Sequence, residues 1–202
     1  MAASETMRLF SAIFPPPEIA QRLAEAARTL AGNFTSKAAA WTAAEQIHLT
    51  LNFLGQVEPA RVDAIARAVD EAARRGQRHR VQARGLGCFP NAARPRVIWA
   101  GLDGDMTALS ALKQNLDDGL AGLGFPPEDR AFHPHLTIGR FKNMNGRERG
   151  HLAEALRRWS ETKFASWTVE RIDLMRSEFS PGGSRYTLVR SFAIAERWST
   201  CA

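Results

Sequence analysis

The chain has 202 residues, of which 45% are hydrophobic and 24% are charged, and these proportions are typical of a soluble globular protein. No apolar run reaches the length of a membrane span, and the opening residues MAASETMRLF lack the basic and apolar regions of a signal peptide. The two cysteines, Cys88 and Cys201, form neither a disulfide framework nor a CxxC motif. We therefore expect a cytoplasmic protein rather than a membrane protein or a disulfide-stabilised secreted one.

The net charge of +6 favours polyanionic partners. The densest basic cluster contains Arg74, Arg75, Arg78 and Arg80. We interpret this cluster as the solvated end of a helix, and a dedicated RNA-binding patch is the alternative.

Apolar periodicity and turn residues predict strands and helices along most of the chain. In chain order, the predicted elements are a strand over 7–14, a helix over 17–30, a strand over 48–54, a helix over 59–75, strands over 80–87 and 96–102, a helix over 106–123, a strand over 135–141, a helix over 147–161, and strands over 167–179 and 185–195. Ser180 to Gly183 form the turn between the last two strands, and Trp41 leads into a turn before the second strand.

The pattern His-x-Thr-x, with apolar residues at both x positions, occurs twice, as His48-Leu49-Thr50-Leu51 and as His135-Leu136-Thr137-Ile138. Strand side chains return to the same face every second residue, so each copy directs one imidazole and one hydroxyl the same way. The copies lie nearly half a chain apart, and each His-x-Thr-x strand sits between helices. We therefore expect one domain over 1–202, a pseudo-duplicated α+β fold with two sheet-bearing lobes and the site in the cleft between them.

These residue types suit chemistry at phosphorus. Two histidines on opposite sides of a reacting centre allow one imidazole to act as a base and the other as an acid near neutral pH. In-line displacement places the attacking and leaving oxygens on opposite sides, which His48 and His135 could serve without a metal ion. The hydroxyls of Thr50 and Thr137 could hold the non-bridging oxygens. Arg140 could neutralise the developing charge, and a surface salt bridge is its alternative role.

The remaining histidines have simpler interpretations. His133 could join His48 and His135 in a metal site, but no carboxylate or cysteine cluster accompanies it. His79 and His151 are expected to be solvated, because they lie in basic, helical surroundings.

Most aromatic residues are expected to pack in the core. Phe53 lies five residues after His48, so regular strand alternation places it on the opposite face, toward the core. Base stacking or a place at the cleft rim is the alternative to core packing for Phe89, Trp99, Phe132, Tyr186 and Trp41.

The sequence around both motifs resembles one family. HLTLNFLG and FHPHLTIGR look like the two signatures of the 2H phosphoesterase superfamily. The segments RLFSAIFPPPEI, WTAAEQIHLTLNFLG, GCFPNAARPRVIWAGL and SPGGSRYTLVRSFAI resemble, in order, further parts of one branch of that superfamily. That branch is the bacterial and archaeal RNA 2′,3′-cyclic phosphodiesterases, formerly called 2′-5′ RNA ligases, and the similarity covers most of the chain.

The resemblance implies two antiparallel sheets lining a central cleft, with helices outside. It implies hydrolysis of a 2′,3′-cyclic phosphate at the end of an RNA or nucleotide to a 2′-phosphate, with no metal or organic cofactor. At the matching positions, His48 is the proton donor to the leaving 3′ oxygen and His135 is the base that activates water. Thr50 and Thr137 match the phosphate-binding threonines, and Arg140 matches an arginine found after the second motif.

The expected partners are RNA 3′ ends or nucleotides that carry the cyclic phosphate. No membrane partner is expected. The protein is expected to be a monomer, and reversal of the reaction would give 2′-5′ RNA ligation as a side activity. Two other hypotheses stay open. The same pocket could bind RNA or nucleotide phosphates without turnover, or it could belong to a metallohydrolase that a chelator would inactivate.

Overall fold

A computed structural model gives the fold of residues 6–35, 37–180 and 183–196. The strands are β1 (Met7–Ile13), β2 (Ala39–Trp41), β3 (Leu49–Val57), β4 (His79–Phe89), β5 (Val97–Gly104), β6 (His135–Phe141), β7 (Lys163–Val169), β8 (Arg171–Ser180) and β9 (Gly183–Ala193). The helices are α1 (Pro17–Ala31), α2 (Val62–Arg75), α3 (Met106–Ala121) and α4 (Gly146–Arg158), with short 3-10 turns η1 (Ala44–Gln46) and η2 (Pro59–Arg61). Residues 181–182 of the predicted final turn lie outside the described residues, as does Cys201.

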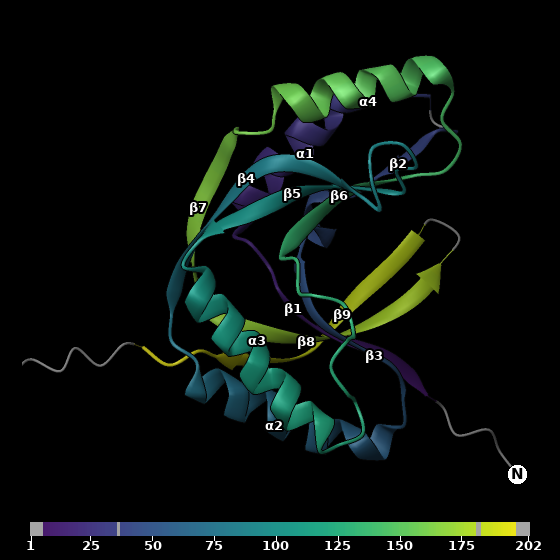
Figure 1. The fold of residues 1–202 in the computed structure, drawn as a ribbon. Helices are drawn as coiled ribbons and strands as arrows, with labels where there is room; N and C mark the ends of the chain where they lie inside the picture. The colour runs from purple at the N-terminus through teal and green to yellow at the C-terminus, as the bar shows by residue number, and fades with distance from the viewer. Residues whose placement is uncertain (1–5, 36, 181–182, 197–202) are drawn as a thin grey trace, which may run out of the picture.

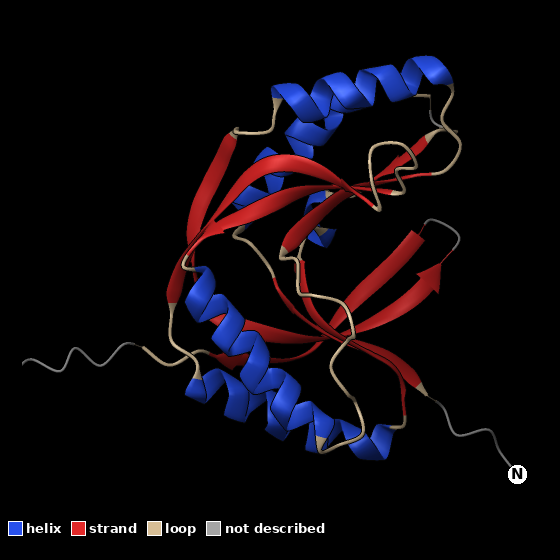
Figure 2. Cartoon of the chain, viewed as in Figure 1, coloured by secondary structure: helices blue, strands red, loops and turns tan. Residues whose placement is uncertain are grey.

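The strands form two antiparallel sheets, with the order β3-β1-β8-β9 in one and β2-β6-β5-β4-β7 in the other. Helices α2 and α3 pack together beside the four-stranded sheet, whereas α1 and α4 accompany the five-stranded sheet (Figures 1 and 2). The predicted bilobal, pseudo-duplicated α+β fold with antiparallel sheets and outer helices is therefore confirmed. Among the described residues, no helix combines the length and apolarity needed to cross a bilayer.

The chain crosses repeatedly between the two lobes. Helix α1 follows β1 of the four-stranded sheet, yet it packs on β2, β6 and β7 of the other sheet. Helix α3 follows β5 of the five-stranded sheet, yet it packs mainly on α2 in the other lobe. One hydrophobic cluster includes buried residues from both sheets. Neither lobe is therefore a continuous segment of the chain, and the two lobes are joined through a shared core.

The predicted single strand over 167–179 is wrong, because this segment changes sheets. Glu170 separates β7, which pairs with β4, from β8, which pairs with β1 and β9. Buried Val169 before the break and buried Ile172 after it are three residues apart, so the two-residue alternation of the strand changes phase at this point. The short strand β2, which includes Trp41, was also missed, and it forms by pairing with β6.

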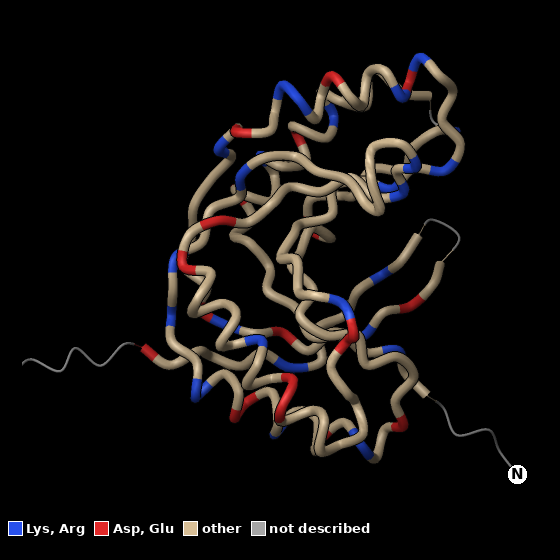
Figure 3. Tube along the Cα trace, viewed as in Figure 1, with Lys and Arg blue, Asp and Glu red and all other residues tan. Residues whose placement is uncertain are grey.

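The basic cluster at the end of α2 is largely neutralised by nearby acids. Three of its arginines form ion pairs, which are Arg74–Asp70, Arg75–Glu71 and Arg78–Glu196. Acidic residues lie among the basic ones on this helix (Figure 3). These pairs favour the solvated helix end over a dedicated RNA-binding patch.

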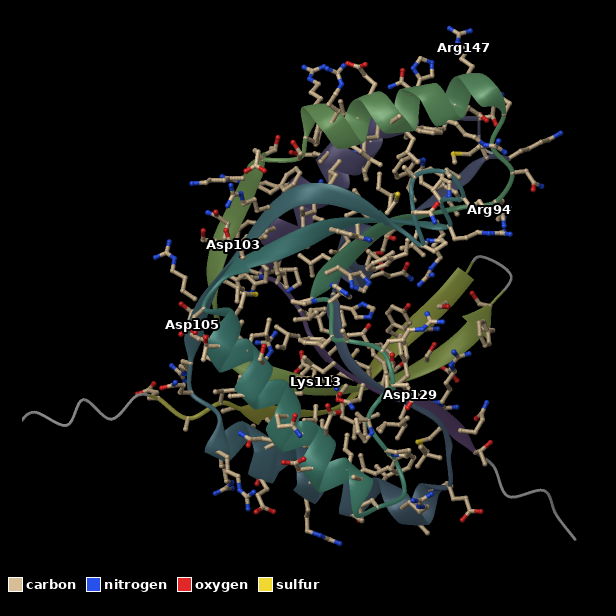
Figure 4. The ribbon with its side chains drawn as sticks, in the orientation of Figure 1. Arg94, Asp103, Asp105, Lys113, Asp129 and Arg147 are labelled. Atoms are coloured by element: carbon tan, nitrogen blue, oxygen red, sulfur yellow. The ribbon has the colours of Figure 1, made fainter. Side chains whose placement is uncertain are left out.

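A buried polar cluster on α3 connects the elements that carry the two motifs. The Oδ1 atom of Asp117 accepts hydrogen bonds from Asn52 Nδ2 of β3 at 2.7 Å and from Lys113 Nζ at 2.5 Å. Lys113 Nζ also lies 5.6 Å from the ring centroid of Phe132, in the loop that leads into β6. Lys113 lies midway along α3 (Figure 4). This helix therefore holds both motif-bearing segments through one buried ion pair.

Removing one charge of the buried pair should cost far more stability than removing both. Lys113→Met leaves the Asp117 carboxylate buried without its cation, and we expect the free energy of unfolding to fall by about 3–5 kcal/mol. The double variant Lys113→Met with Asp117→Leu buries no charge and should recover most of that loss. Urea unfolding followed by circular dichroism measures both.

The matched control is Arg157→Met, which breaks the exposed pair of Arg157 with Glu154 on α4. This change should alter the free energy of unfolding by less than about 1 kcal/mol. A double variant as unstable as Lys113→Met alone would contradict the explanation by uncompensated charge.

Candidate active site

The two motif histidines are held in equivalent ways. His48 directly precedes β3 and His135 begins β6, and each Nδ1 lies 2.7 Å from the carbonyl oxygen two residues earlier. These oxygens belong to Gln46 and His133. A carbonyl only accepts hydrogen bonds, so each neutral imidazole carries its hydrogen on Nδ1. The Nε2 atom of both histidines is therefore the nitrogen available to exchange a proton with a ligand.

Each motif strand contains a β-bulge at the fourth residue of the pattern. In β3, Asn52 pairs with Ser11 and Thr50 pairs with Ala12, so Leu51 is an extra residue. In β6, the register likewise shifts across Ile138, between the pairs Ile98–Gly139 and Trp99–Thr137. An extra residue shifts strand alternation by one position. The sixth residue of each segment, counted from its histidine, therefore faces the same side as that histidine.

The bulges explain why Phe53 is not in the core, where it was predicted to lie, and why Arg140 faces the same side as His135. Phe53 was expected in the core, but 61% of its surface is exposed. Its ring lies 6.4 Å from that of Phe10, the residue with which it pairs across the sheet. Arg140 occupies the corresponding position in β6, is exposed, and forms no ion pair with any described residue. Its charge lowers the pKa of both His48 and His135.

Aromatic rings surround both imidazoles. The rings of Phe10, Phe14 and Tyr186 have centroids 5.0, 5.2 and 5.3 Å from that of His48. The rings of Phe89 and Trp99 lie 5.0 and 6.1 Å from that of His135. Phe10, in the middle of β1, and Phe14, just after its end, were not predicted as site residues, although both are visible in FSAIF.

Core packing is confirmed for some of the candidate aromatic residues. Trp41 and Phe132 are partly buried and pack against the main hydrophobic core. Phe89, Trp99 and Tyr186 are also partly buried, but they contact the motif histidines. These three residues therefore belong to the walls of the site.

The surroundings keep both imidazoles neutral in the free protein. Burial lowers the pKa of His48 to about 4; the hydrogen bond to Gln46 opposes this, and the charges of Arg140 and His135 add to it. Burial also lowers the pKa of His135, with opposition from the His133 carbonyl and a further decrease caused by Arg140. A neutral imidazole is suited to accept a proton, and an imidazole that donates one must first gain it.

The two motif threonines lie on the same strands. Thr50 and Thr137 are partly buried, and neither hydroxyl forms a hydrogen bond with a residue in the described part of the chain. Both hydroxyls are therefore free to bind an anion that enters between the strands.

The other histidines lie outside this group. His79 was expected to be solvated, but it is buried in β4 with Nδ1 2.9 Å from the Gln77 carbonyl oxygen. His151 is partly buried on α4, and His133 is exposed. Within residues 6–35, 37–180 and 183–196, no three His, Cys, Asp or Glu side chains form a group suited to a metal ion.

The absence of a side chain at Gly87 positions the ring beside His135. A Cβ atom at Gly87 would lie 2.0 Å from Cη2 of Trp99, its cross-strand partner. Gly87→Ala should therefore displace the indole and lower the free energy of unfolding by about 1–3 kcal/mol. It should also shift the imidazole resonances of His135, because the ring beside this histidine moves. Urea unfolding and NMR spectra measure the two effects.

Gly150→Ala is the matched control, since a Cβ atom there meets no heavy atom within 4 Å and the residue is exposed on α4. This variant should unfold at the same or a slightly higher urea concentration. Unchanged stability and unchanged His135 resonances in Gly87→Ala would refute the role given to this glycine.

Comparison with known sequences identifies one family. A family model described as LigT like Phosphoesterase matches residues 13–99 and 103–186. A protein of Aeropyrum pernix named RNA 2′,3′-cyclic phosphodiesterase is 36% identical over 144 residues, which cover 70% of this chain and 78% of the relative. A protein of Archaeoglobus fulgidus with the same name is 31% identical over 188 residues, which cover 92% of this chain and 99% of the relative.

Solved structures agree with the sequence matches. The structure of TT0787 of Thermus thermophilus has a TM-score of 0.77 and 30% identity, covering 93% of this chain and 98% of that chain. E. coli LigT complexed with 3′-AMP has a TM-score of 0.73 and 26% identity, covering 94% of this chain and 99% of that chain. The similarity thus extends over both lobes and both His-x-Thr-x strands. This chain is therefore a phosphoesterase that belongs to the LigT-like family of 2H phosphoesterases.

Proposed function

We propose that this protein hydrolyses a terminal ribonucleoside 2′,3′-cyclic phosphate to a 2′-phosphate by a metal-independent mechanism with two histidines. The observation that carries the proposal is the pair of imidazoles from separate sheets, each with Nδ1 bound to a carbonyl oxygen and Nε2 available. The names of the relatives from Aeropyrum pernix and Archaeoglobus fulgidus support this substrate.

In the proposed reaction, Nε2 of His135 takes a proton from a water molecule, which attacks phosphorus. The bond between phosphorus and the 3′ oxygen breaks, and Nε2 of His48 donates a proton to that oxygen. The product carries a 2′-phosphate and a free 3′ hydroxyl. The hydroxyls of Thr50 and Thr137 donate hydrogen bonds to the non-bridging oxygens, and Arg140 neutralises the charge that develops there.

Binding of the anionic substrate explains how His48 gains the proton that it later donates. His48 is neutral in the free protein because burial, with smaller contributions from Arg140 and His135, lowers its pKa to about 4. A bound phosphodiester is an anion, and an opposite charge close to an imidazole raises its pKa. Binding of the substrate thus promotes protonation of His48 at the moment when a proton donor is needed.

The proposal also includes the substrates, the reverse reaction, the cellular location and the oligomeric state. The substrates are RNA 3′ ends or nucleotides, in line with E. coli LigT, whose solved complexes contain 3′-AMP or NADP+. By reversal, the pocket would join a 2′,3′-cyclic phosphate to a 5′ hydroxyl as a 2′-5′ linkage. We propose that the protein acts as a cytoplasmic monomer in RNA processing.

The central test uses a short RNA that ends in a 2′,3′-cyclic phosphate, incubated in the presence of a chelator. The wild type should form a 2′-phosphate at an undiminished rate, whereas His48→Ala and His135→Ala should each lower kcat by about 10²–10⁴-fold. Mass spectrometry and phosphatase sensitivity give the position of the phosphate. Retained binding without turnover by the wild type would favour a binding module, and loss of turnover in the chelator would favour a metallohydrolase.

The pH dependence of kcat/KM tests the two lowered pKa values. The reaction needs one protonated and one neutral imidazole, and kcat/KM reports the free enzyme. Because both pKa values lie below 6.5, the imidazole that acts as the acid loses its proton as the pH rises through the acidic range. We expect the maximum of kcat/KM below about pH 6.5 and a fall of about tenfold per pH unit above it. A maximum at pH 8, measured where the protein stays folded, would contradict the assignment.

A further inference from the structure

Gln46 contacts His48 through its backbone and a distant strand through its side chain. It is the last residue of η1, and its carbonyl oxygen accepts the hydrogen bond from His48 Nδ1 at 2.7 Å. Its side-chain Nε2 donates a hydrogen bond to the carbonyl oxygen of Ser184 in β9, at 2.5 Å. Ser184 lies 138 residues further along the chain. One residue thus links the acceptor of the His48 proton to the hairpin formed by β8 and β9.

The turn η1 gives the Gln46 carbonyl little support of its own. Its backbone hydrogen bonds run from Gln46 N to the Ala43 oxygen at 2.9 Å and from Ile47 N to the Ala44 oxygen at 3.1 Å. The N-cap residue is Ala43, whose side chain has no acceptor for the free N–H groups of the turn. A single 3-10 turn also has poorer hydrogen-bond geometry than an α-helix. The contact with β9 is therefore a main support of this carbonyl.

The same hairpin brings a second contact to the imidazole. Tyr186 follows Ser184 by two residues, and its ring lies 5.3 Å from that of His48 with the two planes at 90°. Residues 173–177 of β8 pair with β1, whereas the ladder between β8 and β9 continues to Ser180 and Gly183. The end of the hairpin thus extends past β1 (Figure 1). The bond from Gln46 to Ser184 anchors it there, so the carbonyl and the ring that contact His48 share one support.

The second motif is held differently. His135 Nδ1 contacts the carbonyl oxygen of His133 at 2.7 Å, but the side chain of His133 is exposed. Among the described residues, no hydrogen bond connects that side chain to another element. The tether is therefore specific to His48, the histidine that donates a proton in the proposed reaction.

We propose that Gln46 is a positioning residue for His48, and that its tether to β9 holds the carbonyl oxygen on Nδ1 so that Nε2 carries the proton to the leaving 3′ oxygen. This inference rests on the proposed function and adds the residue that keeps the acid in place. Burial lowers the pKa of His48, and the hydrogen bond to the Gln46 carbonyl opposes this decrease, because the carbonyl also accepts from the charged imidazole. Gln46 acts through His48, so its loss affects the chemical step more than substrate binding.

The kinetic test replaces Gln46 with methionine, which keeps the length of the side chain and removes the donor. With 2′,3′-cyclic AMP as substrate, Gln46→Met should lower kcat by about 10–100-fold, because a small displacement of the acid is costly. KM should change less than about threefold. Gln46→Ala, which removes the donor and shortens the side chain, should have the same effect.

NMR of the imidazole nitrogens tests the position of His48 without any need for turnover. In the wild type, the Nδ1 and Nε2 resonances of His48 should be those of the tautomer with its hydrogen on Nδ1. In Gln46→Met, the two resonances should move toward each other, because both tautomers become populated. The resonances of His135 should not move, since its carbonyl acceptor does not depend on Gln46.

Gln82→Met is the matched control, because Gln82 is also partly buried and its Nε2 donates a hydrogen bond to another strand, to Ser166 Oγ of β7 at 2.8 Å. This variant should keep the wild-type kcat and the wild-type resonances of His48. Unchanged His48 resonances in Gln46→Met would overturn the inference. So would an equal shift of the His135 resonances, since that effect would come from a general loosening of the fold.

The two measurements separate this inference from the proposed function. If the wild type does not hydrolyse cyclic AMP but the His48 resonances shift in Gln46→Met, the proposed function fails and the hold of Gln46 on the imidazole stands. If the wild type hydrolyses cyclic AMP and Gln46→Met keeps its kcat, the proposed function stands and the role of Gln46 fails.

Discussion

The bulge at the fourth residue of each His-x-Thr-x strand is the constraint on which the rest of the site depends. Without Leu51 and Ile138 as extra residues, strand alternation would turn Phe53 and Arg140 away from the histidines. With them, each lobe presents an imidazole, a hydroxyl and a third side chain on one face. A local irregularity in two hydrogen-bonded ladders thus determines which groups reach a ligand.

The equivalent surroundings of His48 and His135 make both imidazoles neutral in the free protein, and only a bound ligand makes them differ in protonation. Both imidazoles are fixed by a carbonyl oxygen two residues earlier, surrounded by aromatic rings and held neutral by burial. Neither one is a proton donor in the free protein. An anion bound between the lobes changes this balance, because it favours a cationic imidazole beside it. In the proposed reaction, the acid and base roles therefore follow from the orientation of the substrate in a nearly symmetric site.

The lobes keep a defined separation because they are not independent units. Helices α1 and α3 each pack away from the sheet that precedes them, and β7 runs into β8 with a change of sheet at Glu170. The buried pair of Lys113 and Asp117 adds contacts to Asn52, which lies in β3, and to Phe132, which precedes β6. Strands from different sheets can then hold two side chains at a fixed distance without pairing with each other.

The sequence by itself determined the local elements, the duplication and the residues of the two motifs. Strand alternation and helical periodicity are patterns of apolar residues within short segments of the chain, so they need no knowledge of the tertiary structure. Helices over 17–30 and 106–123, the strand over 135–141 and the pattern around His48 could all be predicted this way. The tertiary structure decided the partners of each strand, including the change of sheet at Glu170. It also decided the faces of Phe53 and Arg140, because a bulge exists only in the register between two strands, and it decided the pKa of His48, because burial depends on rings that lie far apart in the chain.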